Sequence, residues 1–318
     1  MASLSLVFLG SAPFALPSLR QLLQGGYSPV AAVTRPDRPA GRGKKMTATP
    51  VKEEAQEHHL DVYQPESKGQ LLEILHKLQP QLLINVAYGM ILPDAVLALP
   101  PWGCLNLHPS LLPRYRGAAP IQRALMAGES VTGVTLMYMA VRLDAGDIIL
   151  QEPVAVEPED NFGTLHDRLA NTGAALLLQG LNLLTRGQAP RVPQDDKLAT
   201  FAPPLSREEE EINWSDPAEK IFNLVRALAP FPGAFTRFRG MRLKIWKTGL
   251  PQPVPEGLEG EATGTVPGKI CHIGTASLAV YCGSGILPLL EVQPESKRRI
   301  DARSFVQGYR LQVGESFA

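Results

Sequence analysis

Cysteine is scarce in this sequence, and its placement excludes two kinds of site. The chain has 318 residues but only three cysteines, Cys104, Cys271 and Cys282, which are odd in number and far apart. They form neither a disulfide framework nor a pair at the spacing of zinc ligands. A reducing compartment therefore fits the chain best.

Net charge and long apolar runs are also missing. Lys plus Arg and Asp plus Glu both total 31, so the formal net charge is zero, which argues against a wholly basic protein that wraps nucleic acid. Any polyanionic partner must meet a local patch. No apolar run approaches the roughly 20 residues of a membrane span, and the first residues lack the basic start of a secretory signal. We expect a soluble, cytoplasmic protein.

The remaining composition is that of a folded chain with long loops. Hydrophobic residues make up 44% and charged residues 19%, close to the globular range, and the length of 318 residues suggests two domains. Glycine (28) and proline (29) are clearly more frequent than usual. We therefore expect many turns and shaped loops, which is where sites usually lie.

The first half of the chain predicts an α/β domain. A strand at 4–9, a helix at 14–23 and a strand at 30–34 form one βαβ unit, which requires a parallel sheet. Further strands are expected at 82–86, 104–108, 131–139 and 148–153, of which the last two are antiparallel. The predicted fold is a Rossmann-like, mostly parallel sheet with helices on both faces.

The second half changes in character. Residues 188–207 contain four prolines among polar residues and predict a stiff, extended linker. A helix at 216–228 follows, and short strands with Gly-rich turns from Ala234 onward predict a smaller C-terminal β-barrel. The expected parts are thus a catalytic domain at 1–187, the linker at 188–207 and a second domain at 208–318.

An amide and an imidazole share one face of a predicted strand. Asn106 and His108 are two residues apart near the carboxyl end of the 104–108 strand, where open α/β sheets bind their ligands. Asn106 could stabilise an oxyanion and His108 could act as an acid or base, although spacing alone slightly favours a pair satisfied by the backbone. The following loop, with Pro109, Pro113 and two arginines, favours the functional interpretation.

A carboxylate follows in the next loop. Asp144 precedes Gly146, and by itself an Asp before a Gly is usually a turn residue. Together with Asn106 and His108, it is placed to orient the imidazole. The sequence has neither a G-x-S-x-G nucleophile motif nor a G-x-G-x-x-G dinucleotide motif, so neither a covalent intermediate nor NAD is expected.

Three basic segments could meet a polyanion. Residues 35–45 place five cations beside one acid directly after a strand, which favours phosphate contact over a plain solvated loop. In the second segment, Arg242 and Lys244 share a strand face with Trp246, a combination that suits nucleic acid. The third surrounds Arg298. Each alone is more often a solvated face, but three on a neutral chain favour a nucleic-acid partner.

The two polar loops carry a family resemblance. Residues 106–113 (NLHPSLLP) and 143–147 (LDAGD) resemble the formyltransferases that use 10-formyltetrahydrofolate. Residues 35–45, 212–215 and 230–236 are similar to the members of that family that act on initiator methionyl-tRNA, and the likeness covers essentially the whole chain. The chain departs from the family pattern at Ala140, Arg142 and Pro204.

The resemblance implies roles for individual residues. Asn106, His108 and Asp144 would be catalytic, and Ser110, Leu111, Leu112 and Pro113 would line the folate site. The C-terminal barrel would be OB-like and would hold the tRNA body. The expected tRNA-binding residues are Arg35, Arg38, Arg42, Lys44, Lys45, Arg242, Lys244 and Arg298.

The implied activity is formylation of the methionine amino group on initiator tRNA by a monomeric enzyme that requires no metal. Two other functions remain open from the residues. The acceptor could be an amino sugar or a nucleotide, in which case residues 35–45 would be superfluous to turnover. Alternatively, the chain could be a noncatalytic RNA-binding relative, against which the intact Asn106, His108 and Asp144 argue.

Overall fold

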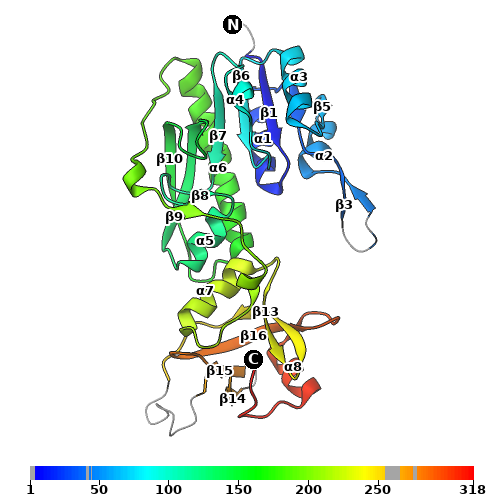
Figure 1. Ribbon diagram of the computed structural model, residues 1–318, viewed down its shortest axis with the longest axis vertical. Coiled ribbons are helices and arrows are strands. Elements are labelled where there is room, and N and C mark those ends of the chain that lie inside the picture. The colour runs from blue at the N-terminus through cyan, green and yellow to red at the C-terminus, as the bar shows by residue number, and fades with distance from the viewer. Residues whose placement is uncertain (1–3, 41–42, 44, 255–265, 275–277) are drawn as a thin grey trace. The chain divides into compact units, whose positions relative to one another are not determined.

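The chain forms two compact units. The computed structural model describes residues 4–40, 43, 45–254, 266–274 and 278–318 (Figure 1). The first unit comprises Met1–Pro120, Val131–Ala155 and His166–Ala202, and the second comprises Ile121–Ser130, Val156–Leu165 and Pro203–Ala318.

A mostly parallel sheet forms the centre of the first unit. Its strands follow the order β10-β9-β7-β6-β1-β2-β5, in which the β10–β9 and β9–β7 pairs are antiparallel and the other pairs are parallel. Their bounds are β1 (Leu6–Gly10), β2 (Ala31–Val33), β5 (Val62–Tyr63), β6 (Leu82–Val86), β7 (Cys104–His108), β9 (Val131–Tyr138) and β10 (Ile148–Ala155). All residues of β1 and β7 are buried, as expected for strands covered on both faces.

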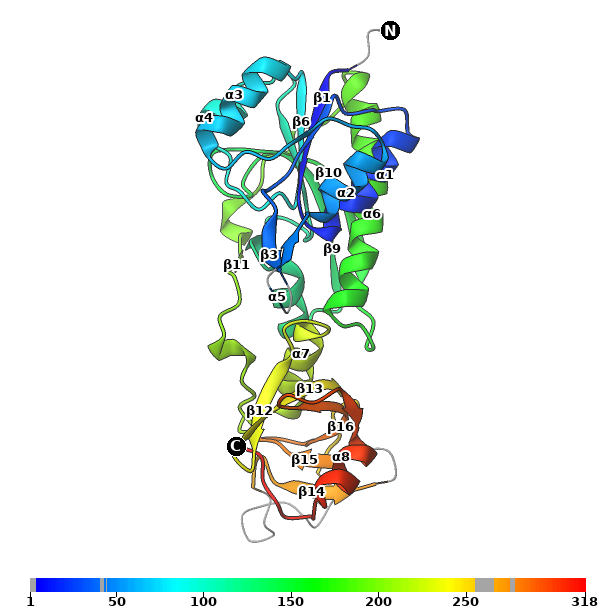
Figure 2. The ribbon, with the colours of Figure 1, turned by 90° about the vertical axis from the view of Figure 1, so that its right-hand side faces the viewer.

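Helices cover both faces of this sheet. Figure 2 shows α3 and α4 on one face and α1, α2 and α6 on the other. Their bounds are α1 (Leu16–Gln24), α2 (Pro50–Glu57), α3 (Lys68–Leu78), α4 (Asp94–Leu97) and α6 (Phe162–Thr185). Thr49 caps α2 and Ser67 caps α3 through their hydroxyls, which accept from backbone amides of the first turns. On the opposite face Gly173 of α6 lies against Leu107 of β7.

Two small sheets extend from the first unit. β3 (Arg38–Ala40) and β4 (Lys45–Thr47) form an antiparallel hairpin, and β8 (Arg116–Gly117) pairs in parallel with β11 (Phe201–Ala202). The second pair is unexpected, because β11 belongs to the segment predicted to be a plain linker. Residues 192–202 belong to the first unit and form hydrogen bonds with its other segments, as a packed element does. The domain limits at 187 and 207 stay a prediction.

The second unit is an antiparallel sheet accompanied by helices. Its strand order is β12-β13-β16-β15-β14, and β17 pairs with β16. The strands are β12 (Ala234–Phe238), β13 (Met241–Thr248), β14 (Ile270–Ile273), β15 (Leu278–Tyr281), β16 (Ile286–Pro294) and β17 (Ile300–Asp301). The α-helices of this part of the chain are α5 (Pro120–Met126), α7 (Ala218–Leu228) and α8 (Ala302–Tyr309).

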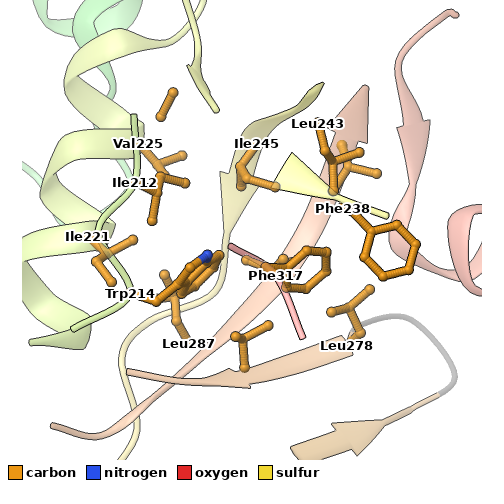
Figure 3. Packing of buried hydrophobic residues seen from close by; sticks show 14 of the residues in the cluster. Ile212, Trp214, Ile221, Val225, Phe238, Leu243, Ile245, Leu278, Leu287 and Phe317 are labelled. Carbon is orange, nitrogen blue, oxygen red and sulfur yellow. The ribbon is translucent and has the colours of Figure 1, made fainter. Parts of the chain in front are cut away.

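The core of the second unit is built around two aromatic rings. Trp214 and Phe317 stack with their centroids 5.7 Å apart, and Trp214 Nε1 donates to Thr236 Oγ1 at 2.9 Å. Ile221 and Val225 of α7 pack against them from the helix side, as Figure 3 shows. The apolar spacing that predicted a helix at 216–228 is thus the face that this core buries.

The fold class is that predicted from the sequence. The first unit has the mostly parallel sheet with helices on both faces, and the second is smaller and rich in antiparallel strands. Within the described part of the chain, every helix is too short or too polar to cross a membrane.

Candidate active site and nucleic-acid interface

The polar pair predicted on one strand lies buried at the carboxyl end of β7. Asn106 is 8% exposed and His108 is 4% exposed. His108 Nε2 lies 2.9 Å from the carbonyl oxygen of Tyr115, and because a carbonyl only accepts, Nε2 carries the proton. The imidazole is therefore held by the turn that follows the 109–114 loop.

A neighbouring amide sets the orientation of Asn106. Asn85 of β6 is in register with Asn106, and its Nδ2 donates to Asn106 Oδ1 at 2.8 Å. With its oxygen used in this way, Asn106 has its own Nδ2 group to donate elsewhere. Asn85 was not predicted from the sequence, because the adjacency of β6 and β7 is a tertiary contact.

Asp144 reaches the same place from the loop between β9 and β10. Its Oδ2 lies 3.7 Å from His108 Nδ1 and accepts a hydrogen bond of 2.9 Å from the backbone amide of Gly117. Asp144 has a φ of +49°, a left-handed conformation that is uncommon outside glycine. His108 and Asp144 thus face each other, and Asn106 lies two residues before His108 on the same strand. Their catalytic role stays a prediction.

A close backbone approach fixes the Asp144 loop. A Cβ on Gly146 would lie 1.8 Å from the carbonyl oxygen of Tyr138, so only glycine fits there. Asp144 is therefore also a turn residue, which is the ordinary interpretation of an Asp before a Gly. This turn, closed by Gly146, fixes the position of Asp144.

Of the four predicted folate-lining residues, two are buried and two are half-buried. Ser110 is fully buried, and its hydroxyl donates to the carbonyl oxygen of Arg114 at 2.7 Å. Leu112 is also buried and its amide donates to Thr135 Oγ1, whereas Leu111 and Pro113 are half-buried. In the structure, Ser110 and Leu112 shape the loop from within. Their contact with folate remains a prediction.

The first basic segment is the β3–β4 hairpin. Arg38 and Lys45 are exposed on it, whereas Arg35 is half-buried and its Nη1 donates to the carbonyl oxygen of Gly89 at 3.2 Å. Asp37 anchors the base of the hairpin through Lys52 Nζ at 2.6 Å. The predicted contacts Arg42 and Lys44 lie outside the described residues.

In the second unit, cations flank an indole. Lys244 Nζ lies 5.2 Å and Arg299 Cζ 3.6 Å from the centroid of the Trp246 ring. Burial, together with the charge of Arg242, lowers the pKa of the Lys244 ammonium. Arg298 is exposed beside Arg299. Lys244 therefore lies beside Trp246, whereas the Arg242 guanidinium packs over the Phe235 ring, with Cζ 3.6 Å from its centroid, and donates to Glu210 Oε2 at 3.3 Å. The use of these cations for tRNA stays a prediction.

The other reactive groups have ordinary explanations. Burial raises the pKa of the Cys104 and Cys282 thiols to about 12, so neither is a thiolate nucleophile. Among the residues that the structure describes, no three His, Cys, Asp or Glu side chains are grouped to hold a metal ion.

Comparison with known proteins shows the family of the chain. The family model "Formyl transferase" matches residues 4–181, and the model "Formyl transferase, C-terminal domain" matches residues 204–310. The chain belongs to the formyl transferase family.

Two relatives in that family carry the same name. The chain is 47% identical to the methionyl-tRNA formyltransferase of Syntrophus aciditrophicus, with 99% of each chain covered. It is 48% identical to the methionyl-tRNA formyltransferase of Moorella thermoacetica, with 98% of each covered. The resemblance drawn from the motifs is confirmed.

Solved structures confirm the fold. HypX from Aquifex aeolicus, in complex with tetrahydrofolic acid, matches 99% of the chain with a TM-score of 0.64 and 18% identity. The chain spans about half the length of HypX, at 49%. The methionyl-tRNA formyltransferase from Clostridium thermocellum matches 78% of this chain and 93% of its own length, with a TM-score of 0.53 and 16% identity.

Proposed function

We propose that the protein transfers the formyl group of 10-formyltetrahydrofolate to the α-amino group of methionine on initiator tRNA, for translation initiation. The observation that carries this function is the near-full-length identity to methionyl-tRNA formyltransferases, at 47% over 317 residues. That identity extends through the C-terminal domain, so it includes the region expected to bind tRNA and not only the region expected to catalyse transfer.

The reaction is an acyl transfer between two nitrogens. The amine nitrogen attacks the formyl carbon, and the carbonyl oxygen becomes an oxyanion in the tetrahedral intermediate. Asn106 Nδ2 is available to donate to this oxyanion because Asn85 occupies Asn106 Oδ1. Such a buried, preoriented donor is worth about 3 to 4 kcal/mol in the transition state.

Collapse of the intermediate breaks the bond between N10 and the formyl carbon. Overall, one proton leaves the attacking amine and one proton is gained by N10 of the leaving folate. His108 lies beside the Asp144 carboxylate, with 3.7 Å between Nδ1 and Oδ2. When the substrates replace the Tyr115 carbonyl as the partner of Nε2, this nitrogen is placed to carry the proton and to stabilise the oxyanion while the ring is charged. Without substrates, the Tyr115 carbonyl fixes the orientation of the ring.

The tRNA is bound by surfaces separate from the reacting atoms. The hairpin cations Arg38 and Lys45 are exposed, as phosphate contacts require, and Arg35, Arg42 and Lys44 belong to the same basic segment. In the second unit, Lys244 lies beside the Trp246 indole, and we assign Arg242 and the exposed Arg298 to tRNA as well. The enzyme works as a monomer in the cytoplasm, where translation initiates.

A formylation assay tests the proposed function. Purified protein is mixed with initiator tRNA charged with methionine and a labelled formyl donor, and in parallel with a nucleotide-linked amino sugar. We expect the label on the tRNA only. Transfer to the sugar alone would assign the chain to the sugar-modifying branch, and folate binding without transfer to either acceptor would indicate a noncatalytic relative.

A further inference from the structure

The segment predicted to be a linker runs along the candidate active site. Val192 and Ile148 exchange backbone hydrogen bonds of 2.8 and 3.0 Å. Farther along, the carbonyl oxygen of Thr200 accepts from the amide of Arg116 at 2.9 Å, and Thr200 Oγ1 accepts from the amide of Tyr115 at 2.8 Å. Residues 192–202 therefore contact both loops that surround His108.

Gln194 links these two loops with a single side-chain amide. Its Nε2 donates to the carbonyl oxygens of Asp144 and Gly146, both at 2.8 Å. Its Oε1 accepts from Arg116 Nε at 3.1 Å and Arg116 Nη2 at 2.7 Å. The carbonyls only accept and the guanidinium only donates, so the orientation of the amide is determined and both of its ends are used.

Arg116 makes this link rigid. It is 4% exposed, and its Nη1 donates to Asp196 Oδ1 at 2.9 Å. Arg142, one of the departures from the family pattern, donates to both oxygens of the same Asp196 carboxylate, at 2.5 and 2.7 Å. The Asp144 loop and the Tyr115–Gly117 turn are thus tied to the same short segment.

Both loops hold strained residues that touch His108. Tyr115, whose carbonyl contacts Nε2, has a φ of +60°, and Asp144, which faces Nδ1, has a φ of +49°. Left-handed conformations of such residues cost free energy and persist only where the surroundings hold them. The side chains of Gln194 and Asp196 both join the Asp144 loop to Arg116, the residue after Tyr115. Gln194 differs from Asp196 because it holds the backbone carbonyls of Asp144 and Gly146 directly.

We propose that Gln194 is a positioning residue for catalysis, which fixes the Asp144 loop against the Tyr115–Gly117 turn and thereby holds His108 between Tyr115 and Asp144. The proposal rests on the function proposed above, since the kinetic effect is measured in formyl transfer. Gln194 touches neither reacting group and acts through the loop backbone.

The test uses Gln194→Glu, which keeps an acceptor for Arg116 but loses both donors to the Asp144 and Gly146 carbonyls. Gln188→Glu is the control, because Gln188 is exposed on the same segment and the change of charge is the same. We expect kcat to fall about 10- to 100-fold in Gln194→Glu, with KM for both substrates unchanged, since small misplacements of catalytic groups have effects of this size. An equal kcat in Gln194→Glu and wild type would overturn the proposal.

A double-mutant cycle identifies the route of the effect. If Gln194 acts through Asp144, Gln194→Glu lowers kcat no further in an Asp144→Ala background. If the losses of kcat in the two single variants instead multiply in the double variant, Gln194 does not act through Asp144.

A spectroscopic measurement does not depend on turnover. The ring resonances of His108 should shift in Gln194→Glu and stay in place in Gln188→Glu. Unchanged resonances would overturn the positioning role even if the wild type formylates no tRNA, an outcome that would separately refute the proposed function.

Discussion

The buried cluster at the end of β7 and the exposed β3–β4 hairpin both carry polar residues, but in opposite environments. Asn106 and His108 are at most 8% exposed and have defined partners, whereas Arg38 and Lys45 are exposed to solvent. A group that acts on a developing charge benefits from burial and fixed orientation. A group that meets a phosphate must remain accessible, and its contribution weakens with salt.

The largest expected effect comes from removing the buried groups. His108→Ala should lower kcat by about 10² to 10⁴, and Asn106→Ala by about 10² to 10³. Affinity for tRNA should be unchanged. Single-turnover formylation measures the rate of transfer, and filter binding measures the affinity for tRNA. Asn171→Ala, at an exposed position of α6, is the control. Full activity in either site variant would remove that residue from the mechanism.

A smaller loss is expected from Gly146→Ala. The new Cβ would lie 1.8 Å from the Tyr138 carbonyl oxygen, so the Asp144 loop must move. We expect kcat to fall about 10²-fold, the loss associated with a displacement of about 1 Å. In Gly69→Ala the nearest atom is 3.8 Å away, so this variant should keep full activity. Wild-type kinetics in Gly146→Ala would show that the loop geometry is not required.

The exposed hairpin should respond in affinity rather than in rate. Arg38→Ala, Arg42→Ala and Lys45→Ala should each raise KM for tRNA several-fold and reduce the salt slope by about 1, the value for one phosphate contact. kcat at saturating tRNA should stay constant. Lys77→Ala, an exposed site on α3, should change neither quantity. A change in folate kinetics alone would assign the hairpin to the other substrate.

The smallest expected effect comes from Glu54 and concerns the stability of the fold, not catalysis. Hydrogen bonds from Arg20, and to a lesser degree His58, hold the pKa of the buried Glu54 carboxyl below its usual 4.5. A carboxyl with a lowered folded-state pKa stabilises the protein above its unfolded pKa, and this contribution is lost as the pH falls below about 4.5.

We therefore expect Glu54→Gln to lower the free energy of unfolding by about 1 kcal/mol at pH 7 and by less in acid. Thermal melts between pH 3 and pH 7 measure this difference, with the exposed Glu73→Gln as the control. kcat should not change, in contrast to the effect of Asp144→Ala. A pH-independent difference in melting would refute the role of the Glu54 charge.

The parts of the site that could be predicted are local in sequence. The alternation along β7 placed Asn106 and His108 on one face, and the Asp-Ala-Gly turn marked Asp144. The sequence did not predict that part of the 188–207 segment is hydrogen-bonded to the first domain's other segments. The proline content of a segment indicates a stiff backbone but does not show which segments it pairs with. Asn85 and Gln194 carry no local signal, since their partners lie 21 and 50 residues away.

By itself, the sequence determined the α/β class, the strand that presents the amide and imidazole, the family, and the basic segments, because periodicity, turn residues and charge act between near neighbours. The tertiary structure alone decided which way the Asn106 amide faces, how Asp144 meets His108, and that residues 192–202 join the two loops around the site. Those features depend on hydrogen bonds between distant segments, which form only when the sheet brings the segments together.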